Sequence, residues 1–163
     1  MRRWSSPKPS CTGLMTPGRQ RAIRSFFYGA CWCAERRQGL RIFLLILFGS
    51  AGTLARYAMG GVVQHRAGSS FPAGTLAVNL VGCFLLGGVG EYALQHLSIP
   101  PDWRIGITVG FFGAFTTFSS FAYESSRMIE DGDWIRMVVY VSVSVVGGIL
   151  LTVAGIHLAD LVS

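Results

Sequence analysis

The residues best suited to chemistry in this chain are hydroxyl and aromatic side chains within a long apolar stretch, Gly110-Phe-Phe-Gly-Ala-Phe-Thr-Thr-Phe-Ser-Ser-Phe121. Gly110 and Gly113 precede two threonines, and this pattern predicts a break in a helix around Gly113–Thr116. A break within a membrane would expose carbonyl oxygens, which suit a cation such as sodium. The stretch therefore indicates a polar site at a depth where lipid excludes most polar groups.

Two phenylalanines in this stretch, Phe118 and Phe121, are spaced so that they share one helix face, with hydroxyls at Thr117 and Ser120 nearby. An aromatic ring carries positive charge at its edge, so two ring edges can replace part of the water around a small anion. The alternative is that both rings simply face lipid, and composition alone favours that explanation.

Other polar side chains also fall inside apolar blocks, where they usually mark a pathway or a buried network. Asn79 brings two amide N–H donors, and a helix–helix hydrogen bond explains it equally well. Arg56 is either a structural anchor or a source of positive potential for an anion. The remaining hydroxyls of this kind are those of Tyr140, Ser142 and Ser144.

Four apolar blocks carry these residues, and each has about the 20 residues that a helix needs to cross a bilayer. Lipid offers the backbone no hydrogen-bond partners, so each block is expected to be a helix. The predicted fold is an all-α membrane protein with both termini on one side. Its spans cover about residues 42–63, 73–97, 105–123 and 137–158. Glu124–Arg136 is predicted to be the loop between the last two spans, in which the acids Glu130, Asp131 and Asp133 form a solvated turn.

Composition supports a membrane protein, because 51% of the 163 residues are hydrophobic and only 13% are charged. Residues 1–41 hold nine basic residues and one acid, a net charge of +8, whereas the remainder has five basic and seven acidic residues, or −2. Residues 1–40 are therefore predicted to be a disordered or membrane-surface extension, and 41–163 the membrane domain. Alternatively, the working chain begins near Gly39. The positive charge requires no nucleic-acid partner.

No group of residues suggests catalysis or a side-chain metal site. The three histidines lie at loops or span ends, and no two could chelate a metal together on one helix face. Cys31 and Cys33 form an isolated pair, and Cys83 is predicted to be a small packing residue within a span. We therefore do not expect an enzyme.

From about Leu40 to Leu158 the sequence resembles the Fluc fluoride channels, also called the CrcB family. Three motifs carry this resemblance: Gly49-Ser-Ala-Gly-Thr-Leu-Ala-Arg-Tyr57, Gly74-Thr-Leu-Ala-Val-Asn-Leu-Val-Gly82, and the stretch Gly110–Phe121. The resemblance implies an antiparallel dual-topology homodimer in the cell's inner membrane. Two pores along its subunit interface would let fluoride leave the cytoplasm down its gradient and so lower fluoride toxicity.

The resemblance also implies roles for individual residues. The pore would be lined by Phe118, Phe121, Asn79, Tyr140 and Ser144. Fluoride is small and strongly hydrated, so a selective pore needs several donors in succession, and Thr75 and Ser120 extend that set. A structural sodium ion at the dimer centre would be held by the backbone carbonyls of Gly113 and Thr116 from each subunit.

The sequence departs from the family pattern at two places. Family members often carry a serine one turn beyond Ser144, where this chain has Gly148. The basic extension would hold the N-terminus in the cytoplasm by the positive-inside rule, whereas an antiparallel homodimer needs both orientations. Either the extension is absent from the working protein, which we favour, or it does not dictate insertion, or the chain pairs with an oppositely inserted relative.

Two other classes of protein remain as alternatives. A small dual-topology coupled transporter of the multidrug type also has four short spans, but it would need a membrane carboxylate in its first span, and this chain has none there. A membrane-embedded assembly subunit would carry no ion flux and would need neither Phe118 nor Asn79.

Overall fold

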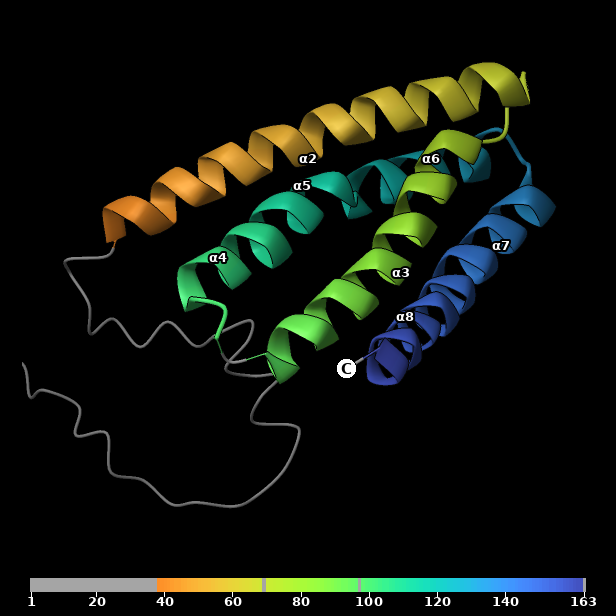
Figure 1. Cartoon of the computed structure of the whole chain (residues 1–163). Coiled ribbons are helices and arrows are strands. Elements are labelled where there is room, and N and C mark those ends of the chain that lie inside the picture. Colours follow the sequence, from red (N-terminus) through yellow and green to blue (C-terminus); the bar gives the residue numbers. More distant parts are fainter. Residues whose placement is uncertain (1–37, 69, 97, 163) are drawn as a thin grey trace, which may run out of the picture.

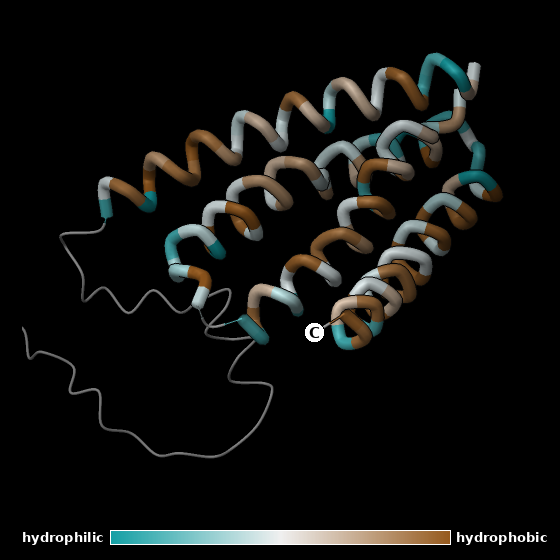
Figure 2. The backbone as a smooth tube through the Cα atoms, viewed as in Figure 1, coloured by the Kyte–Doolittle hydropathy of each residue, from teal (hydrophilic) through white to brown (hydrophobic). Residues whose placement is uncertain are grey.

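The computed structural model describes residues 38–68, 70–96 and 98–162, which form helices joined by short turns (Figure 1). In this part of the chain, four helical segments are long and apolar enough to cross a membrane. Hydrophobic residues run along these segments, while hydrophilic ones gather toward the helix ends (Figure 2). The chain is therefore an all-α multi-pass membrane protein.

The four spans run antiparallel in sequence order. The first is α2 (Gln38–Ala67) and the second is α3 (Ala73–Gln95). The third is divided into α4 (Pro101–Ile105), the π-helical η1 (Gly106–Phe112), α5 (Gly113–Phe115) and α6 (Phe118–Glu130). The fourth consists of α7 (Trp134–Ser142), the π-helical η2 (Val143–Gly147) and α8 (Gly148–Val162).

The first helix begins earlier than the sequence predicted. Residues 38–40, assigned to the basic extension, form the first turn of α2. The rest of the predicted extension, with Cys31 and Cys33, lies outside the described residues.

The loop predicted at Glu124–Arg136 is shorter than expected, because α6 continues to Glu130 and α7 begins at Trp134, but Glu130, Asp131 and Asp133 are exposed as predicted. The turn itself is short, and Gly132 adopts a φ of +79°, a conformation that glycine accepts without a Cβ penalty. The Asp133 N–H donates to Met128 O at 2.8 Å, which closes the helix end as in a Schellman motif. The charged residues between Glu124 and Glu130 resemble a loop in the sequence, because the sequence alone does not show which face of a helix each one occupies.

Glycines bring the second and fourth spans into close contact. The α-carbon of Gly155 in α8 faces the backbone of Phe84, and Gly87 in α3 faces the carbonyl of Thr152 in the same way. A Cβ at either glycine would overlap those backbone atoms. Small residues let membrane helices approach until their backbones touch, so the α3–α8 pair is held by packing along its length.

A buried ion pair joins the first and third spans at one end of the bundle. Arg41 Nε donates to Asp102 Oδ1 at 2.9 Å, and Arg41 Nη2 lies 2.9 Å from the same oxygen. The Asp102 residue is only 3% exposed, so its charge needs this partner. The pair therefore ties the start of α4 to the start of α2.

We expect Gly155→Ala to lower stability by about 1 to 3 kcal/mol, because the added methyl group overpacks the α3–α8 contact. Gly61→Ala is the matched control, since a Cβ at Gly61 meets nothing within 4 Å. It should be neutral or stabilising by up to about 1 kcal/mol, because alanine is the better helix former. Thermal unfolding in detergent measures both, and equal effects would contradict the packing assignment.

Candidate functional site

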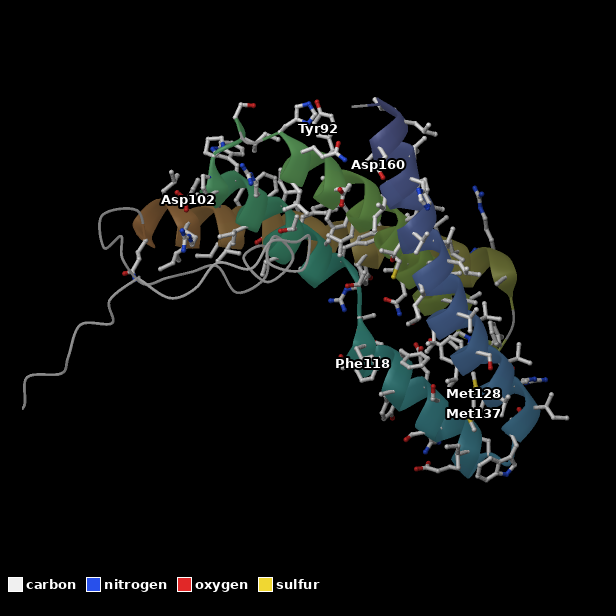
Figure 3. The ribbon with its side chains drawn as sticks, turned by 90° about the horizontal axis from the view of Figure 1, so that it is seen from below. Tyr92, Asp102, Phe118, Met128, Met137 and Asp160 are labelled. Carbon is white, nitrogen blue, oxygen red and sulfur yellow. The ribbon has the colours of Figure 1, made fainter. Side chains whose placement is uncertain are left out.

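The third span changes direction between α5 and α6. Thr116 (φ −80°, ψ 155°) and Thr117 (φ −142°, ψ 112°) both have extended backbones. Figure 3 shows α6 leaving in a new direction, with Phe118 at the corner. Gly113 is helical, with φ −64° and ψ −33°, so the departure from the helix occurs two residues before Phe118 and not at the glycine.

Asn79 bridges the second span to the extended residues. The Thr117 N–H donates to Asn79 Oδ1 at 2.8 Å, and Asn79 Nδ2 donates to Thr117 O at 3.1 Å. The Thr117 hydroxyl then caps α6 by accepting from the Ser120 N–H at 3.2 Å. The Asn79 amide thus pairs both backbone groups of a residue that is only 9% exposed. The helix–helix hydrogen bond considered for Asn79 is therefore present.

These bonds redirect two backbone donors away from the helix. In a continuous helix the N–H of residue 117 would donate to Gly113 O and that of residue 120 to Thr116 O. Here the first donates to Asn79 and the second to the Thr117 side chain. Gly113 is also exposed on the surface of the described chain. The carbonyl oxygens of Gly113 and Thr116 are thereby released from these helical donors.

A cleft of about 260 Å³ lies beside the break, and we call it the pore cleft. Its lining comprises Asn79, Cys83, Leu86, Thr116, Thr117, Phe118, Phe121, Ser144 and Val145. The rings of Phe118 and Phe121 are 5.6 Å apart between centroids. Ser144 Oγ is buried and has no hydrogen-bond partner among the described residues. Buried hydroxyls of this kind are uncommon and are normally satisfied by water or an ion.

A second, larger cavity of about 610 Å³ lies on the other side of Thr117, and we call it the vestibule. Thr75 and Ser120 line it together with Arg56, whereas Thr117 lines both cavities. The structure thus brings Asn79, Phe118, Phe121 and Ser144 together in the pore cleft and places Thr75 and Ser120 in the vestibule.

Tyr140 lies between the helices and is fully buried, so it does not open directly onto either cavity. Its hydroxyl donates to Glu124 Oε2 at 2.7 Å, and its ring lies 5.2 Å from that of Phe121 between centroids. The other carboxylate oxygen of Glu124 accepts from Thr75 Oγ1 at 2.7 Å. Glu124 also lines the vestibule and is the site residue that sequence reasoning missed. Its spacing of three residues from Phe121, on the face already singled out, was the available signal.

The fold and these cavities define a small four-span membrane protein with hydrogen-bond donors and aromatic rings gathered at a helix break. Residues 43–156 match the family described as CrcB-like protein, Camphor Resistance (CrcB). The chain belongs to this family.

Individual relatives agree with the assignment. The chain is 47% identical over 120 residues to the fluoride-specific ion channel FluC of Geobacter metallireducens, covering 74% of this chain and 97% of the relative. It is 44% identical over 119 residues to that of Citrifermentans bemidjiense, covering 73% and 96%. It is 41% identical over 122 residues to that of Nitratidesulfovibrio vulgaris, covering 75% and 98%. These relatives are named as channels, and they give no support to the coupled-transporter alternative.

We expect Asn79→Leu to lower stability by about 1 to 3 kcal/mol, because it leaves the buried N–H and C=O of Thr117 without their partner. Val81→Leu is the control on the same helix, where residue 81 is 37% exposed and lines neither cavity. It should unfold at nearly the wild-type temperature. Equal melting temperatures for wild type and Asn79→Leu in detergent would show that the amide bridge does not hold the break.

Proposed function

We propose that this chain forms a passive fluoride-selective channel of the plasma membrane that lets fluoride leave the cytoplasm. The observation that carries the proposal is the pore cleft, where the unpartnered Ser144 hydroxyl, the Asn79 amide and two phenylalanine rings meet. An amide has two N–H groups, and Thr117 O takes one of them. The names of the relatives support fluoride as the ion.

The proposed path begins in the vestibule, where Arg56 supplies positive potential that concentrates anions. Hydroxyls of Thr75 and Ser120 line this cavity, and Thr117 marks its boundary with the pore cleft. Selectivity for a small, strongly hydrated anion requires that lining groups replace its water. In the pore cleft, ring edges and hydrogen-bond donors perform that replacement, and the apolar wall disfavours bulk water.

The working unit is proposed to be an antiparallel homodimer with a sodium ion at its centre. The released carbonyls of Gly113 and Thr116 are hard oxygen ligands, and they fit sodium in the way that unwound helices of transporters do. One chain supplies only this pair, so an inverted second copy would complete the coordination. The ion would supply the positive charge that binds the two breaks together.

The exposure of the pore cleft supports a second subunit. Phe118 is 79% exposed although it lines the cleft, so this wall is open in a single chain. Basic residues are nearly balanced between the two ends of the described bundle, with Arg41 and Arg104 at one end and Arg66, Arg127 and Arg136 at the other. Such a small bias permits both orientations.

The direct test is fluoride efflux from liposomes that contain the purified full-length chain. We expect rapid loss of fluoride and no loss of chloride, and Phe118→Ile should slow fluoride efflux by more than about tenfold, or about 1.4 kcal/mol of barrier. Tyr123→Ile is the matched control, because Tyr123 is also exposed on α6 but lines neither cavity. It should conduct as wild type. A folded wild-type protein that releases neither ion would overturn the proposal.

Orientation is tested with a chain in which all four cysteines are serine and Asp131→Cys marks the α6–α7 turn. A membrane-impermeant maleimide applied to intact cells should label roughly half of the copies, as a two-fold antiparallel dimer requires. Ser98→Cys, at the opposite end of the bundle, should give the same fraction. Complete labelling at one position and none at the other would establish a single orientation, and would mean that the basic extension sets insertion.

A further inference from the structure

Cys83 lies in the wall of the pore cleft. It follows Asn79 by one helical turn on α3, so the two side chains share a face, and both line this cleft. Cys83 is a partly exposed free thiol. Cys83 therefore lines the cleft in addition to packing against the fourth span as expected.

The Cys83 sulfur faces Gly148 of the fourth span, which has no side chain. Ser144 and Gly148 are one turn apart in the fourth span, and a Cβ built on Gly148 would lie 3.4 Å from Cys83 Sγ. The thiol therefore occupies the space beside Gly148, where the fourth span offers no side chain. Thr152 Oγ1 links the two backbones here, since it contacts Gly148 O at 2.9 Å and Cys83 O at 3.3 Å.

A separate observation indicates that this part of the cleft holds a polar occupant. Ser144 Oγ has less than 1 Å² of exposed surface and no hydrogen-bond partner among the described residues, yet Ser144 lines the same cleft as Cys83. A buried hydroxyl without a protein partner is normally satisfied by water or an ion. A water or ion that satisfied Ser144 from this cleft would share the cleft with the thiol.

We infer that the Cys83 thiol lines the anion path beside Gly148, as the polar group that follows Ser144, and that covalent modification of this thiol closes the path. This inference rests on the proposed channel function. A thiol is a weak hydrogen-bond donor, so it can contact an anion where Gly148 cannot. The cleft has a volume of about 260 Å³, so a group attached to Sγ would narrow the passage.

The modifying reaction is a thiol–disulfide type of exchange with methyl methanethiosulfonate. The Cys83 thiolate attacks the sulfenyl sulfur of the reagent, forming a methyl disulfide and releasing methanesulfinate, while the thiol proton passes to solvent. Dithiothreitol reverses the step by reducing the mixed disulfide, which releases methanethiol and restores the Cys83 thiol.

The experiment uses the full-length chain with Cys11, Cys31 and Cys33 changed to serine, so that Cys83 is the single cysteine. Fluoride efflux from liposomes is measured before treatment, after methyl methanethiosulfonate and after dithiothreitol, and intact mass reports the extent of modification. We expect modification to slow efflux by more than about tenfold and dithiothreitol to restore it. With Cys83→Ser added, treatment should leave the efflux rate of that variant unchanged.

Two further variants separate a pore role from general damage. In the first, Cys83→Ala is combined with Val81→Cys, which puts the thiol on the same helix but outside the pore cleft. Modification there, confirmed by mass in detergent before reconstitution, should not change efflux. The second is Cys83→Leu, which should slow efflux without any reagent while the protein still elutes as a folded species.

The outcomes distinguish this inference from the proposed function. A parent that conducts fluoride, but whose thiol does not react in the folded protein or whose modified form conducts unchanged, would overturn the role of Cys83 and leave the channel intact. A folded parent that conducts no fluoride would overturn the channel and this inference with it.

Discussion

The structure depends on how a membrane helix can be interrupted without leaving its backbone unpaired. Lipid supplies no hydrogen bonds, so an extended residue in the middle of a span must find partners inside the protein. The Asn79 side chain supplies both hydrogen-bond partners of Thr117, because its amide accepts from the Thr117 N–H and donates to the Thr117 carbonyl. No smaller polar side chain has a donor and an acceptor fixed in this relation. The amide therefore removes the cost of unpaired backbone groups at the break. The break in turn creates the cavities on its two sides.

The position of Asn79 is itself set by the packing of α3. Glycine contacts hold α3 against α8, and on the same helix Gly74 and Gly82 face the backbone of Gly60 and the side chain of Thr116. A helix fixed on several sides cannot slide to follow the break, so the amide stays aligned with residue 117. The π-helical η2, which contains Ser144, lies across the pore cleft. Such stretches alter the register of side chains and are frequent at functional sites.

Sequence reasoning could find the spans and most of the cleft because apolar blocks interrupted by polar residues are unambiguous in a membrane protein. It missed Glu124, because a carboxylate at the edge of an apolar block resembles the start of a loop. Only the three-dimensional packing shows that Thr75 and Tyr140 converge on its two oxygens. The break lies at the end of the predicted range Gly113–Thr116, since Thr116 and Thr117 are the extended residues. A glycine marks a place where a helix can end. In this span the hydrogen bonds of the Asn79 and Thr117 side chains set the position of the break.

The groups left without protein partners at the cleft and the break are costly in a bilayer. Ser144 Oγ lacks a partner, and the carbonyls of Gly113 and Thr116 have lost their helical donors. Facing hydrocarbon, each such group would cost several kcal/mol, and the packing of neighbouring helices within one chain cannot offset that cost. The proposed second subunit and sodium ion would each reduce that cost by giving these groups partners. Both proposals therefore depend on the break that Asn79 stabilises.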